Sequence, residues 1–130
     1  MYREDIELAV NARFNACSPY SNFEVGAALR TKDGKVYTGC NIENHGIQGI
    51  CAERVAFVKA LSEGERDFEC ITIVGAKINE IPTDKCMPCG YCRQFMSEYV
   101  DKDFKIIVVN NDDSVEEYTI DELLPHSFEF

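Results

Sequence analysis

Apolar residues recur at intervals of three to four positions in three segments of the chain, a spacing that predicts amphipathic helices. The first helix is expected over residues 6–16, where the turn-forming sequence CSPYSN follows it. The second is expected to begin at Cys51 and to end near Gly64, and the third to cover residues 90–100. A last, short helical turn is expected at residues 120–125.

Other segments carry continuous or alternating apolar residues, which predicts strands. Residues 24–31 and 35–41 flank a Lys-Asp-Gly turn, so we expect them to form a β-hairpin. The uninterrupted apolar runs at 70–76 and 104–110 predict strands that are buried on both faces. Residues 115–120 are expected to add an edge strand.

The order of these elements predicts the α/β class. Because each of the two fully apolar strands is preceded by a helix, helices should cover both faces of the sheet. We therefore expect a three-layer α-β-α sandwich with a mixed sheet of about five strands. A chain of 130 residues that is 45% hydrophobic suffices for one buried core, so residues 1–130 should form a single domain.

The charge of the chain restricts its partners. The formal net charge is −10, which repels both the phosphate backbone of nucleic acids and anionic membrane surfaces. No apolar run approaches the roughly 18 residues that a membrane span needs, and the first five residues already include charged ones, unlike a secretory leader. We expect a cytoplasmic protein with neither a polynucleotide nor a membrane as partner.

Seven cysteines are many for a chain of this length. An odd number without a secretory leader favours reduced thiols, some of them buried and some bound to metal, over a disulfide framework.

Three of these cysteines lie where loops lead into helices. Cys51 opens the second predicted helix, and Cys89 and Cys92 span the first turn of the third. Unpaired backbone N–H groups and the positive end of the helix dipole favour the thiolate form there. Three thiolates would hold Zn²⁺ and leave its fourth tetrahedral position open, which is typical of a catalytic zinc site.

Three further residues complete the predicted site. The carboxylate of Glu53, two positions after Cys51, can reach the open position and act as a proton shuttle beside an activated water. Arg54 is placed to donate hydrogen bonds to the sulfurs and so to offset their negative charge, and Gln94 is expected to do the same from the other helix.

Other interpretations of these motifs stay open at this point. A Cys-x-x-Cys pair by itself is also typical of a thiol-redox centre or a structural zinc corner, in which case Glu53 would be a charge on the face of a helix. Polynucleotide editing would use the same metal chemistry, but the acidic charge opposes it.

The remaining cysteines and a histidine have simpler expected roles. Cys17, Cys40 and Cys70 are expected to behave as small buried hydrophobes, and Cys86 as a bystander close to the site. His45 is either a pocket residue or an ordinary loop histidine.

The motifs together resemble a known family. The segments CAER at 51–54 and PCGYCRQ at 88–94 match the zinc deaminase signature in its three-cysteine form. The segments PYSNFEVGAAL, DGKVYTGCNIEN and ELLPHSF extend the resemblance to the small homotetrameric cytidine deaminases over nearly the whole chain. The resemblance implies zinc-dependent hydrolytic deamination of cytidine or deoxycytidine in pyrimidine salvage, with active sites shared between subunits.

The resemblance also implies roles for individual residues. Asn41 and Glu43 match the pair that binds the ribose hydroxyls, Phe23 matches the aromatic residue that lies against the pyrimidine, and Phe128 matches one contributed to a neighbouring subunit's pocket. The backbone N–H of Ala52 is expected to meet the carbonyl of the base. The plainer alternatives are packing for the two phenylalanines, a turn role for Asn41 and a solvated charge for Glu43.

Two features depart from the usual cytidine deaminase pattern. The loop at 45–50, HGIQGI, is shorter and lacks an aromatic residue, and Tyr91 replaces a small residue inside the Cys-x-x-Cys turn. Blasticidin S deaminases share both kinds of change and act on a cytosine nucleoside antibiotic, so such an analogue is the alternative substrate. The presence of both Asn41 and Glu43 favours the ordinary nucleoside.

Overall fold

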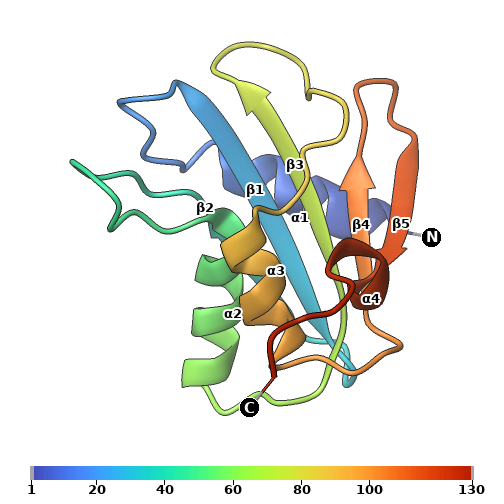
Figure 1. The fold of residues 1–130 in the computed structure, drawn as a ribbon. Helices are drawn as coiled ribbons and strands as arrows, with labels where there is room; N and C mark the ends of the chain where they lie inside the picture. The colour runs from blue at the N-terminus through green and yellow to red at the C-terminus, as the bar shows by residue number, and fades with distance from the viewer. Residues whose placement is uncertain (1, 130) are drawn as a thin grey trace.

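The computed structural model describes residues 2–129, which form a sheet flanked by helices (Figure 1). The strands are β1 (Phe23–Thr31), β2 (Val36–Cys40), β3 (Phe68–Lys77), β4 (Lys105–Val109) and β5 (Val115–Thr119). The helices are α1 (Arg3–Arg13), α2 (Ala52–Ser62), α3 (Gly90–Ser97) and α4 (Ile120–Leu123). Every element predicted from the hydrophobic pattern is present, in the predicted order.

The sheet has five strands in the order β2-β1-β3-β4-β5. Strands β3 and β4 are parallel, with Ile73 opposite Val108, and the other neighbouring strands are antiparallel. The sheet is therefore mixed, and α3 lies in the crossover between the two parallel strands, as parallel pairing requires. The predicted fold class is confirmed.

Helix α1 covers one face of the sheet, and α2 and α3 lie side by side over the other face (Figure 1). Two strand glycines let helices approach closely. A Cβ atom on Gly26 would lie 1.9 Å from the carbonyl oxygen of Ala9 in α1, and one on Gly39 would lie 2.4 Å from that of Ala52 in α2. Because only hydrogen fits at Gly39, the first turn of α2 rests directly on β2.

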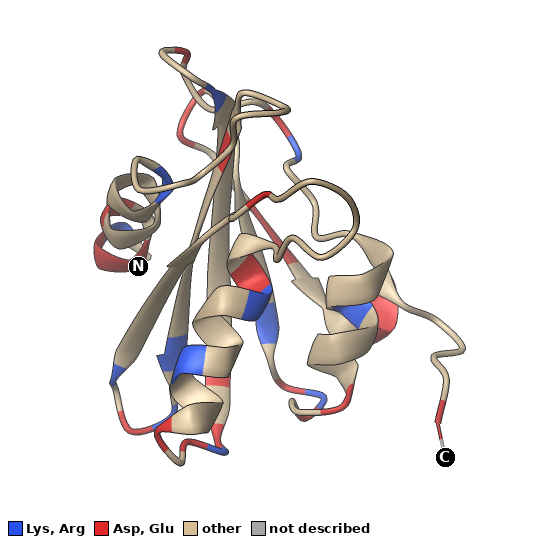
Figure 2. Cartoon of the chain, turned by 90° about the vertical axis from the view of Figure 1, so that its left-hand side faces the viewer, with Lys and Arg blue, Asp and Glu red and all other residues tan. Residues whose placement is uncertain are grey.

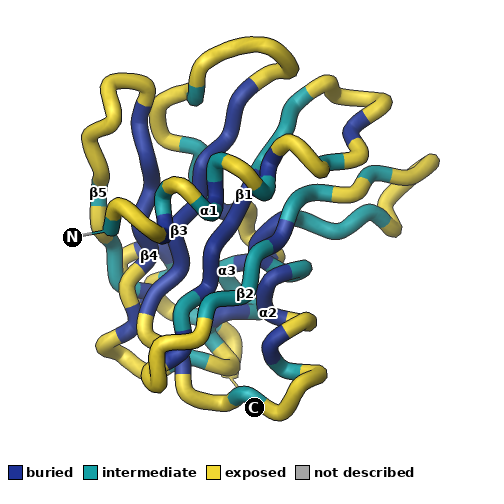
Figure 3. Tube along the Cα trace, turned by 180° about the vertical axis from the view of Figure 1, so that it is seen from behind, coloured by how far each residue is buried: buried dark blue, intermediate teal, exposed yellow. Residues whose placement is uncertain are grey.

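The central strands are the most deeply buried part of the chain, whereas the connecting loops are exposed (Figure 3). The main core lies between the sheet and the α2–α3 layer and includes Phe57, Ile73 and Met96. Ala52 and Cys92 also belong to this core, so part of the predicted site is held by core packing.

Helix α1 differs from its prediction in its bounds, because it spans Arg3–Arg13 and not residues 6–16. It also buries two charged residues. Asp5 is 3% exposed and accepts a hydrogen bond from Arg30 Nε at 3.1 Å, and Arg13 is 5% exposed and pairs with Glu24 at 3.0 Å. These ion pairs satisfy the charges that the helix turns toward the sheet.

Acidic segments lie next to basic ones over much of the chain (Figure 2). Within residues 2–129, the longest helices are too short and too polar to reach across a bilayer.

Candidate functional site

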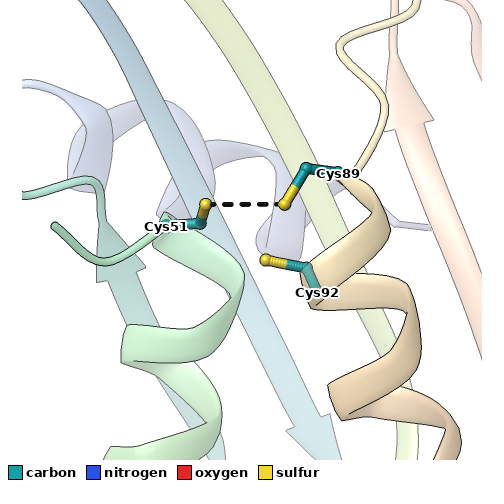
Figure 4. A group of neighbouring side chains, drawn as sticks. All are labelled: Cys51, Cys89 and Cys92. Carbon is teal, nitrogen blue, oxygen red and sulfur yellow. Dashed lines mark hydrogen bonds between the residues drawn. The ribbon is translucent and has the colours of Figure 1, made fainter. Parts of the chain in front are cut away.

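The three cysteines singled out from the sequence meet where α2 and α3 begin. Cys51 is the N-cap residue of α2, Cys89 is the N-cap residue of α3, and Cys92 lies in the first turn of α3. Their Sγ atoms all lie within 4.8 Å of one another and point toward a common centre (Figure 4). The Sγ atoms of Cys51 and Cys89 are 3.9 Å apart.

This cluster fits a zinc ion. All three cysteines are free thiols, and 3.9 Å is far longer than the S–S bond of about 2.05 Å in a disulfide. Two thiolates that bind one tetrahedral zinc at about 2.3 Å are separated by about 3.8 Å, which is close to the observed spacing. Three soft sulfur donors at two helix N-termini suit Zn²⁺ and leave one position for water or substrate.

Arg54 supplies positive charge to the sulfurs. Its Nη2 atom lies 3.7 Å from Sγ of Cys51, as expected for a weak N–H···S hydrogen bond. In the metal-free chain, hydrogen bonding with Cys92 lowers the pKa of Cys51 against the effect of burial, and Arg54 lowers it further. The same hydrogen bond, together with burial, raises the pKa of Cys92. The hydrogen bond with Cys92 and the positive charge of Arg54 both favour the thiolate form of Cys51.

Gln94 does not provide the predicted contact with the sulfurs. Its Nε2 atom donates to Oε2 of Glu98 at 3.0 Å and to the backbone carbonyl of Phe128 at 3.1 Å. These bonds use both of its N–H groups, and they tie the C-terminal tail to α3.

A cavity of about 410 Å³ opens beside the cluster. Seven of the predicted site residues line this cavity: Phe23, Asn41, Glu43, Cys51, Ala52, Glu53 and Cys89. Cys92, Arg54, Gln94 and Phe128 are not among its lining residues. A larger cavity of about 630 Å³ lies between α1 and β5, but it contains none of these residues. The chemistry of the lining, and not the volume, identifies the site.

Glu53 lies deep in this cavity and is only 4% exposed. Burial raises the pKa of its carboxyl group to about 7, and the negative charge of Cys51 adds to the effect. A carboxyl group poised near neutrality can both accept and release a proton. Ala52, the first residue of α2, offers a backbone N–H at the same wall.

Asn41 and Glu43 also line the cavity. Oδ1 of Asn41 accepts from the backbone N–H of Val25 at 2.9 Å, and its Nδ2 donates to the carbonyl of Phe23 at 2.9 Å. The amide is thus held against β1, with one N–H and one lone pair left for a ligand.

The carboxylate of Glu43 is held by a loop that the sequence analysis did not assign to the site. Its Oε1 accepts from the backbone N–H groups of Tyr20 at 3.0 Å and Ser21 at 3.1 Å, and its Oε2 accepts from the Ser21 hydroxyl. The hydroxyl bond is the main reason why the pKa of Glu43 is lowered. The PYSN sequence indicated a turn here, but nothing local in it pointed to Glu43.

Three other residues are placed as follows. Phe128 is 63% exposed and does not line this cavity. His45 is exposed, and its Nδ1 atom lies 3.1 Å from the hydroxyl of Tyr20. Cys86 also lines the cavity. Its sulfur and the ring of Phe23 both lie close to Gly75, because a Cβ atom on Gly75 would be within 3 Å of each.

Known proteins resemble this chain over most of its length. The chain is 46% identical over 125 residues to a cytidine deaminase of Halalkalibacterium halodurans, covering 95% of this chain and 90% of that protein. It is 33% identical over 130 residues to a blasticidin-S deaminase of Bacillus cereus, covering 95% of this chain and 91% of that protein. A crystal structure of cytidine deaminase from Burkholderia pseudomallei matches with a TM-score of 0.87 at 41% identity, covering 98% of this chain and 99% of that one.

The family assignment follows from a match over most of the chain. Residues 2–108 match the family described as the cytidine and deoxycytidylate deaminase zinc-binding region, and this span contains the three clustered cysteines and Glu53. The resemblance inferred from the sequence motifs is confirmed. The chain belongs to the cytidine and deoxycytidylate deaminase family.

Proposed function

We propose that the protein catalyses the zinc-dependent hydrolytic deamination of cytidine or deoxycytidine, releasing ammonia and the uridine product. The observation that carries this proposal is the cavity that two cysteines of the three-sulfur cluster, Cys51 and Cys89, line together with the buried carboxyl group of Glu53. The similarity to cytidine deaminases supports the choice of substrate. A free nucleoside also suits a chain with a net charge of −10, which disfavours a polynucleotide.

Cys51, Cys89 and Cys92 are the proposed ligands of the zinc ion, and Arg54 offsets their charge. Bound zinc supplies a Lewis acid, which makes water a competent nucleophile at neutral pH. A site of three thiolates bears a net charge of about −1, so the nearby guanidinium keeps the metal electrophilic enough for this task.

Glu53 moves the protons of the reaction. Its carboxylate accepts a proton from the attacking water and donates it to N3 of the cytosine ring as the water oxygen bonds to C4. It then carries the remaining proton of that oxygen to the amino group at C4, so that the C4–N bond breaks and ammonia leaves. Burial supports this role because a carboxyl group whose pKa lies near 7 exchanges protons readily in both directions at neutral pH.

The other lining residues orient the nucleoside. The ring of Phe23 packs against the pyrimidine, and the free backbone N–H of Ala52 donates to the carbonyl oxygen at C2. Asn41 and Glu43 bind the sugar hydroxyls with the donor and acceptor positions that their contacts with the protein leave free.

Residues 1–130 are proposed to act as a single domain in a homotetramer whose subunits share active sites. The position of Phe128 supports this arrangement, because its side chain is 63% exposed and lies outside the cavity of its own chain. Sedimentation analysis, together with mixing of inactive Glu53 and Phe128 variants, tests whether a site uses residues of two chains.

A substrate panel tests the proposed function. Cytidine, deoxycytidine, cytosine and blasticidin S are compared by the loss of ultraviolet absorbance on deamination. We expect the highest kcat/KM for cytidine or deoxycytidine. A higher value for blasticidin S would assign the chain to the alternative substrate, to which the short loop at 45–50 and Tyr91 point.

A further inference from the structure

Tyr91 stands in the middle of the Cys89-x-x-Cys92 turn, and its ring is in contact with Arg54. The Cζ atom of Arg54 lies 4.1 Å from the centroid of the Tyr91 ring, well inside the range of a cation–π interaction. Tyr91 belongs to α3 and Arg54 to α2, so this contact connects the two helices that carry the cysteine cluster.

The guanidinium of Arg54 therefore has a sulfur on one side and an aromatic ring on another. Its Nη2 donates to Cys51 at 3.7 Å. Among residues 2–129, its buried Nε atom has no hydrogen-bond partner. A guanidinium with few hydrogen bonds depends on stacking to keep its position, since N–H···S bonds are weak and the side chain has several rotatable bonds.

We propose that Tyr91 is a positioning residue that holds the Arg54 guanidinium against the thiolates and thereby slows the loss of zinc. The proposal rests on the proposed metal site. The ring is 66% exposed, so it acts as a cover on the solvent side of the guanidinium and not as part of the core. Without the ring, Arg54 can rotate toward water, and the negative charge of the three sulfurs is less well compensated.

The test measures the rate at which the zinc-loaded protein releases zinc to an excess of a colorimetric chelator. Tyr91→Leu removes the ring but keeps an apolar residue that favours helix, whereas Tyr91→Phe keeps the ring. We expect Tyr91→Leu to release zinc roughly two- to fivefold faster than wild type, and Tyr91→Phe to match wild type, because an exposed cation–π contact has about that strength. Tyr99→Leu is a matched control, since Tyr99 is also a partly exposed tyrosine but its ring contacts Phe95.

A double-mutant cycle separates this role from a general structural one. In an Arg54→Gln background, replacing Tyr91 by Leu should have no further effect on zinc release, because the cation is gone. If the Leu variant releases zinc at the wild-type rate, or accelerates release equally in both backgrounds, the inference is wrong.

Should Arg54→Gln hold no zinc, a Tyr91→Trp variant takes its place: the inference requires Trp to release zinc no faster than Tyr, and Leu to release it fastest. A wild-type protein that never binds zinc would instead contradict the proposed metal site, whereas a zinc-loaded protein that is insensitive to Tyr91 contradicts only this inference.

Discussion

The Sγ atoms of Cys51 and Cys89 lie 3.9 Å apart, although 38 positions separate the two residues in the sequence. Each residue is the N-cap of a helix, and neither side chain makes a capping hydrogen bond. Both sulfurs are therefore free to bind a metal. A shared zinc ion would fix the two helix starts relative to each other, which couples metal binding to the stability of the α2–α3 layer.

The first prediction concerns metal content. Cys89→Ser removes a proposed ligand at an exposed position, so it should lower the zinc content well below one ion per chain with little disturbance of the core. Cys17 is exposed, so the expectation that it is buried is wrong, and it lies outside the cluster. Cys17→Ser is therefore the control and should keep full zinc content. Elemental analysis of the purified variants measures the difference, and equal zinc in both would exclude Cys89 as a ligand.

A second prediction concerns the pH dependence of stability in the metal-free protein. Burial raises the pKa of Glu53 from its usual value near 4.5 to about 7 in the folded state. Well below pH 4.5 the Glu53 carboxyl group is neutral in both the folded and the unfolded chain. As the pH rises toward 7, the unfolded chain ionises first, so wild type should lose stability relative to Glu53→Gln by on the order of 3 kcal/mol.

Urea unfolding of both proteins with a chelator, between pH 4.5 and pH 8, measures this difference. The comparison with Glu53→Gln removes the part of the pH dependence that the two proteins share. A difference that stays constant across this pH range would show that the Glu53 pKa is not raised.

The third prediction concerns Glu43, which lines the cavity and is proposed to bind the sugar. Ser21→Ala removes the hydroxyl that donates to Oε2 of Glu43, so the carboxylate should be held less firmly for the sugar. We expect KM for cytidine to rise roughly three- to tenfold with little change in kcat, in line with the loss of one hydrogen bond to a charged group. Ser62→Ala, at the end of α2, is the control. An unchanged KM would mean that the two backbone N–H groups are sufficient to orient Glu43.

The fourth prediction concerns the support under α2. A Cβ atom on Gly39 would lie 2.4 Å from the carbonyl oxygen of Ala52 and 2.6 Å from the backbone nitrogen of Ala56. Gly39→Ala must therefore push the start of α2 away from β2, at a cost of about 1–3 kcal/mol in the free energy of unfolding. Chemical denaturation measures this cost, and unchanged stability would show that α2 can shift freely.

The order of elements and the reactive residues could be predicted from the sequence because both depend on short-range patterns. Helical and strand periodicities gave each element, and the spacing of Cys51, Glu53, Cys89 and Cys92 indicated a metal-dependent hydrolase. The structure brings the three sulfurs together and places Glu53 beside them, in the cavity that Cys51 and Cys89 line.

What could not be predicted depends on contacts between distant segments. The support of Glu43 by Ser21 arises only when the loop before β1 meets the loop after β2. The hydrogen bond from Gln94 to the backbone carbonyl of Phe128 depends on where the C-terminal tail lies. The burial of Asp5 likewise depends on Arg30, 25 positions away, which satisfies its charge.

The most direct test of the central claim measures zinc content and cytidine turnover in the same sample of Glu53→Gln. Removing the proton carrier while leaving all three sulfurs in place should keep zinc at about the wild-type level and lower kcat by a factor of about 10² to 10⁴. A variant that keeps its zinc and still deaminates cytidine at close to the wild-type rate would contradict the account.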